Sequence, residues 1–245
     1  MLKGIVTIAG LAVILLAAVP AFGYSAEELV MDLKEGTPDK KLAAAMHLGD
    51  YVQFPEAVTA LSAKLSDPNA DAVLRANCAA ALGRSADPSV YPMVHALATR
   101  VDEKPVVRAG CVLAMGLIKQ EQAIPEFIEL LKTEKSSIVR SQVEDSLRRM
   151  PNPPTVVAAV SPLLNVPEAE TSAIKVLGAV GGPAVIDPLM KLLDVKTSKR
   201  SALIEAVGSV RSPEAARALI GFYRSFAKLL IELIRADARE RRVRR

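Results

Sequence analysis

Apolar residues recur in this chain at two fixed spacings. Within one segment they stand four residues apart, as Cys111 and Met115 do, and this spacing places two side chains on one face of a helix. The segment returns after every 30 to 34 residues. Aligned on their last residue, the copies are Lys41–Gly49, Arg75–Gly83, Arg108–Gly116, Arg140–Arg148, Glu170–Gly178 and Arg200–Gly208. Such a period predicts a stack of helical units that share one continuous core.

A second helix is expected before each copy, and proline often opens it. Proline is tolerated in a first helical turn, where its missing N–H is no loss. The predicted outer helices cover residues 26–35, 55–66, 88–101, 123–133, 155–165 and 183–194. Prolines further in, such as Pro125 and Pro162, should bend these helices. The pattern favours an all-α fold: a right-handed α-solenoid of about six helix pairs in residues 24–212, with no convincing strand.

Composition and charge narrow the possible functions. The chain is 51% hydrophobic and only 4% aromatic, which suits closely stacked helices. Its net charge is +4, but residues 235–245 hold six arginines against Asp237 and Glu240. The remaining residues are close to neutral, so the repeats offer no basic groove. We therefore expect no nucleic-acid partner.

The repeated segments resemble HEAT repeats, in particular the short bacterial kind known as PBS-lyase HEAT-like repeats. The resemblance is carried by an acidic turn residue followed by a basic residue that opens the second helix, as in Asp102 with Val107-Arg108. It implies a ladder of side-chain hydrogen bonds between adjacent units. The residues that it assigns to this ladder are Asp67, Arg75, Asp102, Arg108, Arg140, Asp194 and Arg200. The fifth unit departs from the pattern because Glu170 replaces the basic residue.

The first 23 residues have the layout of a secretory signal peptide. Lys3 precedes an apolar run over residues 5–19, and small residues at Ala21 and Gly23 suit cleavage after Gly23. The run is short for a bilayer span, which needs about 20 residues. An uncleaved membrane anchor is the alternative. Either way the repeats are expected outside the cytoplasm, in a periplasm or a secreted location.

Few residues suggest chemistry. Cys78 and Cys111 occupy the same register in adjacent units, which favours two buried thiols over a disulfide because stacked helices lie about 8–10 Å apart. The two histidines, His47 and His95, belong to no metal-binding motif. The glycines spaced one per unit are explained by helix packing or helix ends. We therefore predict no catalytic residue, no metal and no cofactor.

The segment 213–245 reads as one long amphipathic helix with an arginine-rich end. Its apolar residues are spaced by three and four. Three interpretations stay open: a helix that caps the last unit, a contact with a partner helix or a second copy, and weak docking on a membrane surface. The candidate contact residues in this helix are Phe222, Phe226, Leu229 and Leu233.

The sequence favours an exported, non-catalytic scaffold that binds a protein partner through the inner helices. Candidate contacts on that face are Asn77, Arg84, Lys119, Gln120 and Glu144. The alternative is an enzyme or lyase subunit similar to the HEAT-like lyases that act on bilin pigments. The export signal argues against this alternative, because those lyases work in the cytoplasm.

Overall fold

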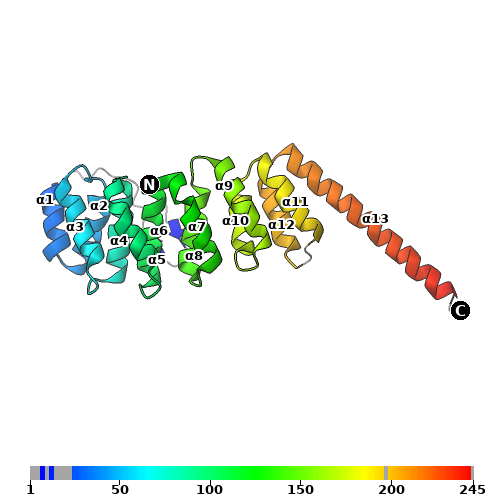
Figure 1. Ribbon diagram of the computed structural model, residues 1–245, viewed down its shortest axis with the longest axis horizontal. Coiled ribbons are helices and arrows are strands. Elements are labelled where there is room, and N and C mark those ends of the chain that lie inside the picture. Colours follow the sequence, from blue (N-terminus) through cyan, green and yellow to red (C-terminus); the bar gives the residue numbers. More distant parts are fainter. Residues whose placement is uncertain (1–5, 9–10, 14–23, 196–197, 244–245) are drawn as a thin grey trace, which may run out of the picture. The chain divides into compact units, whose positions relative to one another are not determined.

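The computed structural model describes residues 6–8, 11–13, 24–195 and 198–243 (Figure 1). Most of these residues lie in helices, and the α-helices alternate between outer and inner members of successive pairs. The pairs are α1 (Ala26–Glu35) with α2 (Pro38–Leu48), α3 (Pro55–Ser66) with α4 (Ala72–Arg84), α5 (Tyr91–Thr99) with α6 (Pro105–Lys119), α7 (Ile124–Thr133) with α8 (Ser137–Arg148), α9 (Pro153–Val160) with α10 (Glu170–Val180), and α11 (Ile186–Val195) with α12 (Arg200–Ser209). Helix α13 (Pro213–Val243) follows.

The chain forms two compact units, residues 1–159 and 160–245. In the first unit the inner helices α2, α4, α6 and α8 pack side by side in that order. In the second unit α10 packs against α12, and α11 and α12 both contact α13. The predicted all-α solenoid of helix pairs is confirmed. The boundary between the units follows the proline-rich segment 151–154, at the end of α9.

Helix starts follow from local chemistry. Ser25 accepts a hydrogen bond from the Glu28 backbone N–H, and the Glu28 carboxylate accepts one from the Ser25 N–H, which is a capping box. Thr37 caps α2 ahead of Pro38 in the first turn, and Asp71 caps α4. These side chains satisfy backbone N–H groups that have no partner within the helix.

Four 3-10 turns adjoin the outer helices in the described part of the chain. They are η1 (Pro88–Val90), η2 (Gln120–Ala123), η3 (Ser161–Asn165) and η4 (Pro183–Val185). Three of these turns, η1, η3 and η4, contain proline. Pro162 lies at the start of η3, where the fifth outer helix changes from α to 3-10 geometry. Proline lacks the N–H that the α pattern needs, so the bend predicted at Pro162 becomes a change of helix type. Pro125 lies in the first turn of α7, where proline is tolerated.

The core is the apolar stripe predicted on the inner helices. The six residues that precede the last aligned position are fully buried: Leu48, Leu82, Met115, Leu147, Leu177 and Val207. The residues four positions earlier are buried as well: Ala44, Cys78, Cys111, Val143, Ala173 and Leu203. Each inner helix therefore hides the same stripe against its neighbours.

Two short strands depart from the expected pattern. β1 (Val6–Ile8) and β2 (Leu11–Val13) pair antiparallel, with Thr7 opposite Ala12. Both lie in the apolar run assigned to the signal peptide, and β-branched residues such as Val6 and Ile8 favour extended backbone. The rest of the predicted signal segment, including its cleavage site, lies outside the described residues. None of the described helices is long and apolar enough to cross a bilayer.

Candidate functional site

The inner helices carry buried charge pairs that join consecutive helix pairs. The Arg75 guanidinium donates through Nε to the Leu65 carbonyl at 2.8 Å, and through its other two nitrogens to the Glu103 carboxylate at 2.9 and 2.7 Å. Both side chains are buried. Arg75 therefore binds its own outer helix and the turn of the next pair together, and the hydrogen bond from Arg75 holds the pKa of Glu103 below its usual value.

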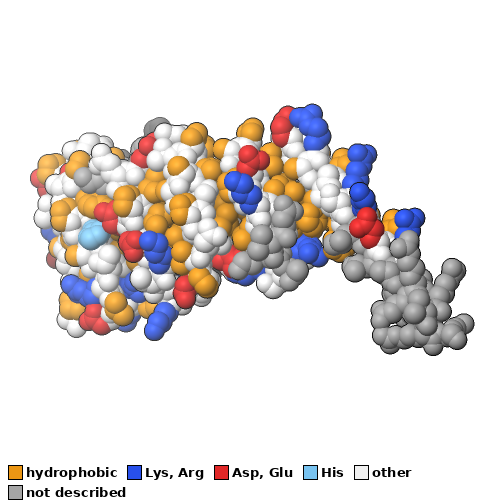
Figure 2. Space-filling view, turned by 45° about the vertical axis from the view of Figure 1, so that its right-hand side comes forward, with side chains coloured by type: hydrophobic (Ala, Val, Ile, Leu, Met, Phe, Trp, Pro, Cys, Tyr) orange, Lys and Arg blue, Asp and Glu red, His pale blue; other side chains and the backbone are white. Residues whose placement is uncertain are grey.

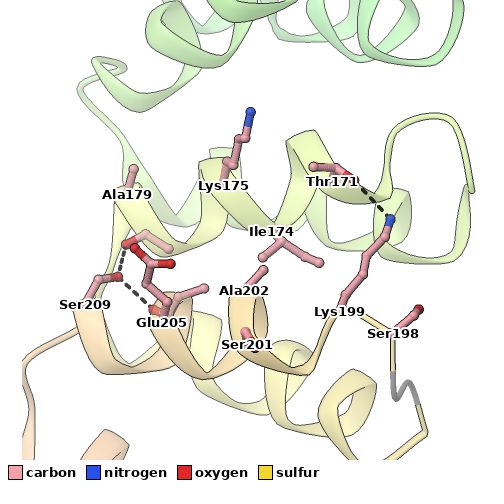
Figure 3. Close-up of a pocket in the computed structure, with 12 residues that line it drawn as sticks. Thr171, Ile174, Lys175, Ala179, Ser198, Lys199, Ser201, Ala202, Glu205 and Ser209 are labelled. Atoms are coloured by element: carbon pink, nitrogen blue, oxygen red, sulfur yellow. Dashed lines mark hydrogen bonds between the residues drawn. The ribbon is translucent and has the colours of Figure 1, made fainter.

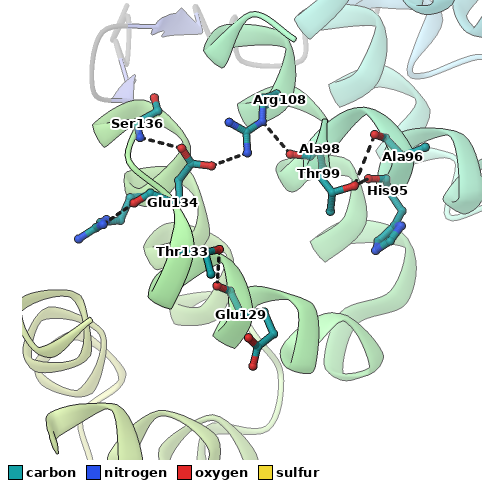
Figure 4. A network of polar contacts seen from close by, with 10 residues as sticks. His95, Ala96, Ala98, Thr99, Arg108, Glu129, Thr133, Glu134 and Ser136 are labelled. Atoms are coloured by element: carbon teal, nitrogen blue, oxygen red, sulfur yellow. Dashed lines mark hydrogen bonds and ion pairs between the residues drawn. The ribbon is translucent and has the colours of Figure 1, made fainter. Parts of the chain in front are cut away.

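The next helix pair repeats this arrangement (Figure 4). Arg108 donates through Nε to the Ala98 carbonyl at 2.9 Å, and its guanidinium pairs with the Glu134 carboxylate. Glu134 also accepts the Ser136 backbone N–H at 2.7 Å, and the Arg140 guanidinium donates to the Glu134 carbonyl. A ladder of arginine–glutamate pairs therefore links the units.

The acidic members of this ladder differ from those that the resemblance implied. Asp67 accepts the Asn69 N–H at 3.0 Å and lies 3.9 Å from the Lys64 ammonium, while Asp102 is exposed in its turn. The actual partners are Glu103 and Glu134, which lie in the turn of the next helix pair. How closely that turn approaches the arginine cannot be read from sequence spacing. The Asp194 side chain lies outside the described residues.

The ladder reverses its charge in the second unit. Glu170 stands at the position that holds arginine in Arg75 and Arg108, and it is buried. The Lys199 ammonium from the following turn donates to the Glu170 carboxylate at 2.9 Å and to the Thr171 hydroxyl at 3.0 Å. Glu170 and Lys199 therefore still form a charge pair, but the acidic residue is now on the inner helix and the basic residue is in the following turn.

Arg200, the last ladder position, meets aromatic rings. Its guanidinium carbon lies 5.8 Å from the centre of the Phe222 ring and 5.1 Å from that of Phe226, within the range of cation–π attraction. Its Nε is buried without a hydrogen-bond partner. The two rings stack on each other, with 6.3 Å between their centres. These contacts fix the first part of α13 against α12.

A groove opens between α10 and α12 in the second unit (Figure 3). Its volume is about 660 Å³. The Ser209 hydroxyl donates to the Gly178 carbonyl at 2.6 Å, and Gly178 has no side chain to hold the helices apart. The lining residues are Thr171, Ile174, Lys175, Gly178, Ala179, Ser198, Lys199, Ser201, Ala202, Glu205, Ala206 and Ser209. The floor is apolar, and both cationic and anionic side chains stand on the rim.

Of the predicted contact residues of the first unit, Asn77 and Arg84 lie on α4 and Glu144 lies on α8. Asn77 donates to the Val73 carbonyl of its own helix at 2.8 Å, and Glu144 is half-buried. Arg84 donates to the Met46 carbonyl at 2.5 Å and thereby joins α4 to α2. The side chains of Lys119 and Gln120 lie outside the described residues. A role of these residues in partner binding stays a prediction.

The predicted contacts in α13 are only partly described. Phe222 is half-buried and Phe226 is 43% exposed, both beside Arg200. The side chains of Leu229 and Leu233 lie outside the described residues. The described aromatic contacts join α13 to α12, as the capping interpretation of this helix requires.

The two cysteines are free, buried thiols. Burial raises the pKa of Cys78 and of Cys111 to about 12, so neither is a thiolate at neutral pH. Among the described side chains, no three His, Cys, Asp or Glu residues come close enough together to hold a metal ion.

Two segments of the chain match known repeat families. Residues 69–148 match the model of HEAT repeats, and residues 171–194 match the PBS lyase HEAT-like repeat. These segments of the chain are HEAT-like repeats. The second match covers Thr171 to Ala179, which form the α10 wall of the groove. None of the curated proteins compared with this chain matches it.

Two solved structures are similar to this chain. One is the complex of CpcE and CpcF of phycocyanin lyase from Nostoc sp. PCC7120, with 21% identity, 80% of each chain covered and a TM-score of 0.49. The other is human deoxyhypusine hydroxylase in complex with glycerol, with 19% identity and a TM-score of 0.37, covering 80% of this chain and 77% of the other.

The prediction that the protein is not an enzyme is wrong. The match of residues 171–194 to the PBS lyase HEAT-like repeat points to a lyase-type enzyme subunit. No local sequence motif marks the groove, because its lining comes from two helices. Lys199 and Ala202 stand about one repeat away from Thr171 and Lys175 in the sequence, so their spacing alone did not indicate a site.

Proposed function

We propose that this protein is a subunit of a lyase-type enzyme, and that its α10–α12 groove receives a bilin pigment. One observation carries the proposal: the segment that matches the PBS lyase HEAT-like repeat supplies the α10 wall of the groove. The groove volume of about 660 Å³ lies within the usual range for small-molecule sites, which is about 300–1,000 Å³.

The chemistry of the groove supports a flat, partly charged ligand. Ile174, Ala202 and Ala206 supply apolar contact area. Lys199 stands at one end, and the carboxylate of Glu205 faces the groove near the other end (Figure 3). A bilin has an extended apolar ring system with two carboxylates, so the apolar floor would contact the rings. The Lys199 ammonium donates to Glu170 and Thr171 and has a third N–H for a carboxylate of the pigment.

Titration of the purified full chain with biliverdin tests this proposal. We expect a saturable change in the visible absorption of the pigment. Ala202→Trp fills the groove from an exposed position and should abolish that change, whereas Val101→Trp, at a site 88% exposed in the first unit, should preserve it. A wild-type chain that leaves the spectrum unchanged would remove the proposal, and so would equal binding by the Ala202→Trp variant.

HEAT repeats also support a protein partner, since stacked helix pairs expose extended surfaces for binding other proteins. We assign this role to the inner-helix face and to α13. Self-association through α13 stays a prediction that light scattering of the purified chain tests.

We also keep the export proposal, which rests on residues 1–23. The measured N-terminus of protein recovered from the producing cells tests it: we expect Tyr24 as the first residue after cleavage. An intact Met1 in a soluble cytoplasmic fraction contradicts it.

A further inference from the structure

Helix α13 carries a line of apolar side chains that are about half exposed among the described residues. The helix extends well past α11 and α12 in Figure 1. Ile220, Tyr223, Ala227 and Ile231 follow one another at spacings of three, four and four residues, which places them on one side of the helix. Ile220 is 50% exposed, Tyr223 51% and Ile231 48%. The line is available to a binding partner.

The spacing of this line suits one helix as its occupant. A different side of α13 is already occupied, because Ala215 is buried and the rings of Phe222 and Phe226 contact Arg200. Apart from Phe226, the large apolar side chains of α13 that are described as exposed lie in one row at coiled-coil spacing, as in a seam between two helices.

A row of cations runs beside the apolar line. Arg217, Arg224, Lys228 and Arg235 are exposed and stand seven, four and seven residues apart, which aligns them along the helix. In Figure 2 the blue side chains follow the first part of α13, with apolar side chains beside them. Arg217 pairs with Glu214 at 2.7 Å, whereas Arg224 and Lys228 contact no acidic residue among the described side chains.

We propose that α13 binds an acidic amphipathic helix of a partner subunit. Apolar residues of that helix pack on Ile220, Tyr223 and Ile231, and its flanking carboxylates lie against Arg224 and Lys228. Complementary charges beside a seam select the partner in helix pairs. A second copy of α13 brings the same cations to the seam and is disfavoured by like-charge repulsion. The proposal deepens the protein-partner part of the proposed function and is independent of the bilin groove.

Two synthetic peptides of equal length test the proposal on the full chain. Both carry Leu at the seam positions of three heptads; one has Glu at every flanking position and the other has Lys. Binding is measured by fluorescence anisotropy. We expect the Glu peptide to bind with an affinity that falls as salt is added, and the Lys peptide not to bind.

Matched variants locate the contact. R224E combined with K228E should weaken binding of the Glu peptide at least tenfold. R148E combined with K132E makes the same charge change on α8 and α7, where Arg148 is exposed and Lys132 half-buried, and should not weaken it. Tyr223→Ser should also weaken binding, whereas Val101→Ser should not. Circular dichroism establishes that each variant is folded.

Several results would overturn the proposal. The proposal of an acidic partner helix is contradicted by equal binding of both peptides or by no binding of either. It is also contradicted if the Glu peptide still binds the R224E and K228E double variant. A dimer in light scattering that Tyr223→Ser dissociates assigns the seam to a second copy. Sedimentation with phosphatidylglycerol vesicles, lost in the same variants, assigns it to lipid. The biliverdin titration is unaffected by α13 variants if the groove proposal holds, so the two proposals fail separately.

Discussion

Single residues in this protein join helix pairs through buried charge. Arg75 satisfies a backbone carbonyl of its own pair and a carboxylate of the next, with both partners out of water. Removal of one member leaves the other charge buried and unpaired, which costs more than the pair itself contributes. The ladder residues therefore act mainly by fixing how one unit meets the next.

Glu103→Gln tests this role. We expect the free energy of unfolding to fall by about 3 kcal/mol, because the buried Arg75 charge loses its counterion. Urea unfolding measures the loss. Glu129→Gln is the control, since its pair with Lys132 lies on the surface and contributes at most about 1 kcal/mol. A Glu103→Gln variant as stable as wild type would contradict a structural role for the pair.

The effect of Glu103→Gln on the free energy of unfolding should depend on pH. The pKa of Glu103 is lowered in the folded state, chiefly by the hydrogen bond from Arg75. The stability that it contributes is therefore present above its unfolded pKa, about 4.3, and is lost as the pH falls through the lower folded value. The stability gap between wild type and Glu103→Gln should narrow in this acid range.

At the scale of elements, α10 and α12 pack closely because a glycine lies where they meet. A Cβ on Gly178 would lie 2.9 Å from the Ala206 Cα, closer than real contacts allow, and α10 and α12 meet at this point. A Cβ on Gly208 would meet nothing within 4 Å. Both glycines lie in helices, so the same substitution has opposite expected effects at the two positions.

Gly178→Ala should therefore lower the stability of the second unit by about 1–3 kcal/mol through overpacking. Gly208→Ala should raise it by about 0.5–1 kcal/mol, because alanine is the better helix former. Thermal or urea unfolding of both variants checks the two signs. A Gly178→Ala variant that is stabilised as much as Gly208→Ala would show that the helices separate without cost.

At the scale of the whole molecule, the chain is divided into two compact units. Repeat proteins are stabilised by contacts between neighbours, so distant repeats need not unfold together. We expect equilibrium unfolding in urea to depart from a single two-state transition.

The variants above assign the transitions. Glu103→Gln, in the first unit, should lower the midpoint of one transition, and Gly178→Ala, in the second unit, that of the other. Circular dichroism across the urea range measures both. One sharp transition that both variants shift equally would mean that the two units unfold as one.

The helix pairs and the apolar stripe that they bury could be predicted from residue spacing. Leu82, Met115 and Leu177 could be placed in the core because a residue's position on a helix face follows from its spacing alone. The family resemblance followed from the same repeats. A local pattern was sufficient because each unit contacts chiefly its neighbours in sequence.

Which charges meet, and where a groove opens, depends on the packing of the helices. Glu103, not an aspartate, reaches Arg75, and Lys199 reaches back to Glu170. The groove arises where α10 and α12 face each other, and the seam on α13 stays exposed because α11 and α12 cover only part of that helix. The charge pairs join residues 28 and 29 positions apart, and the groove likewise joins two helices one repeat apart. These contacts depend on how neighbouring helices pack, which residue spacing does not specify.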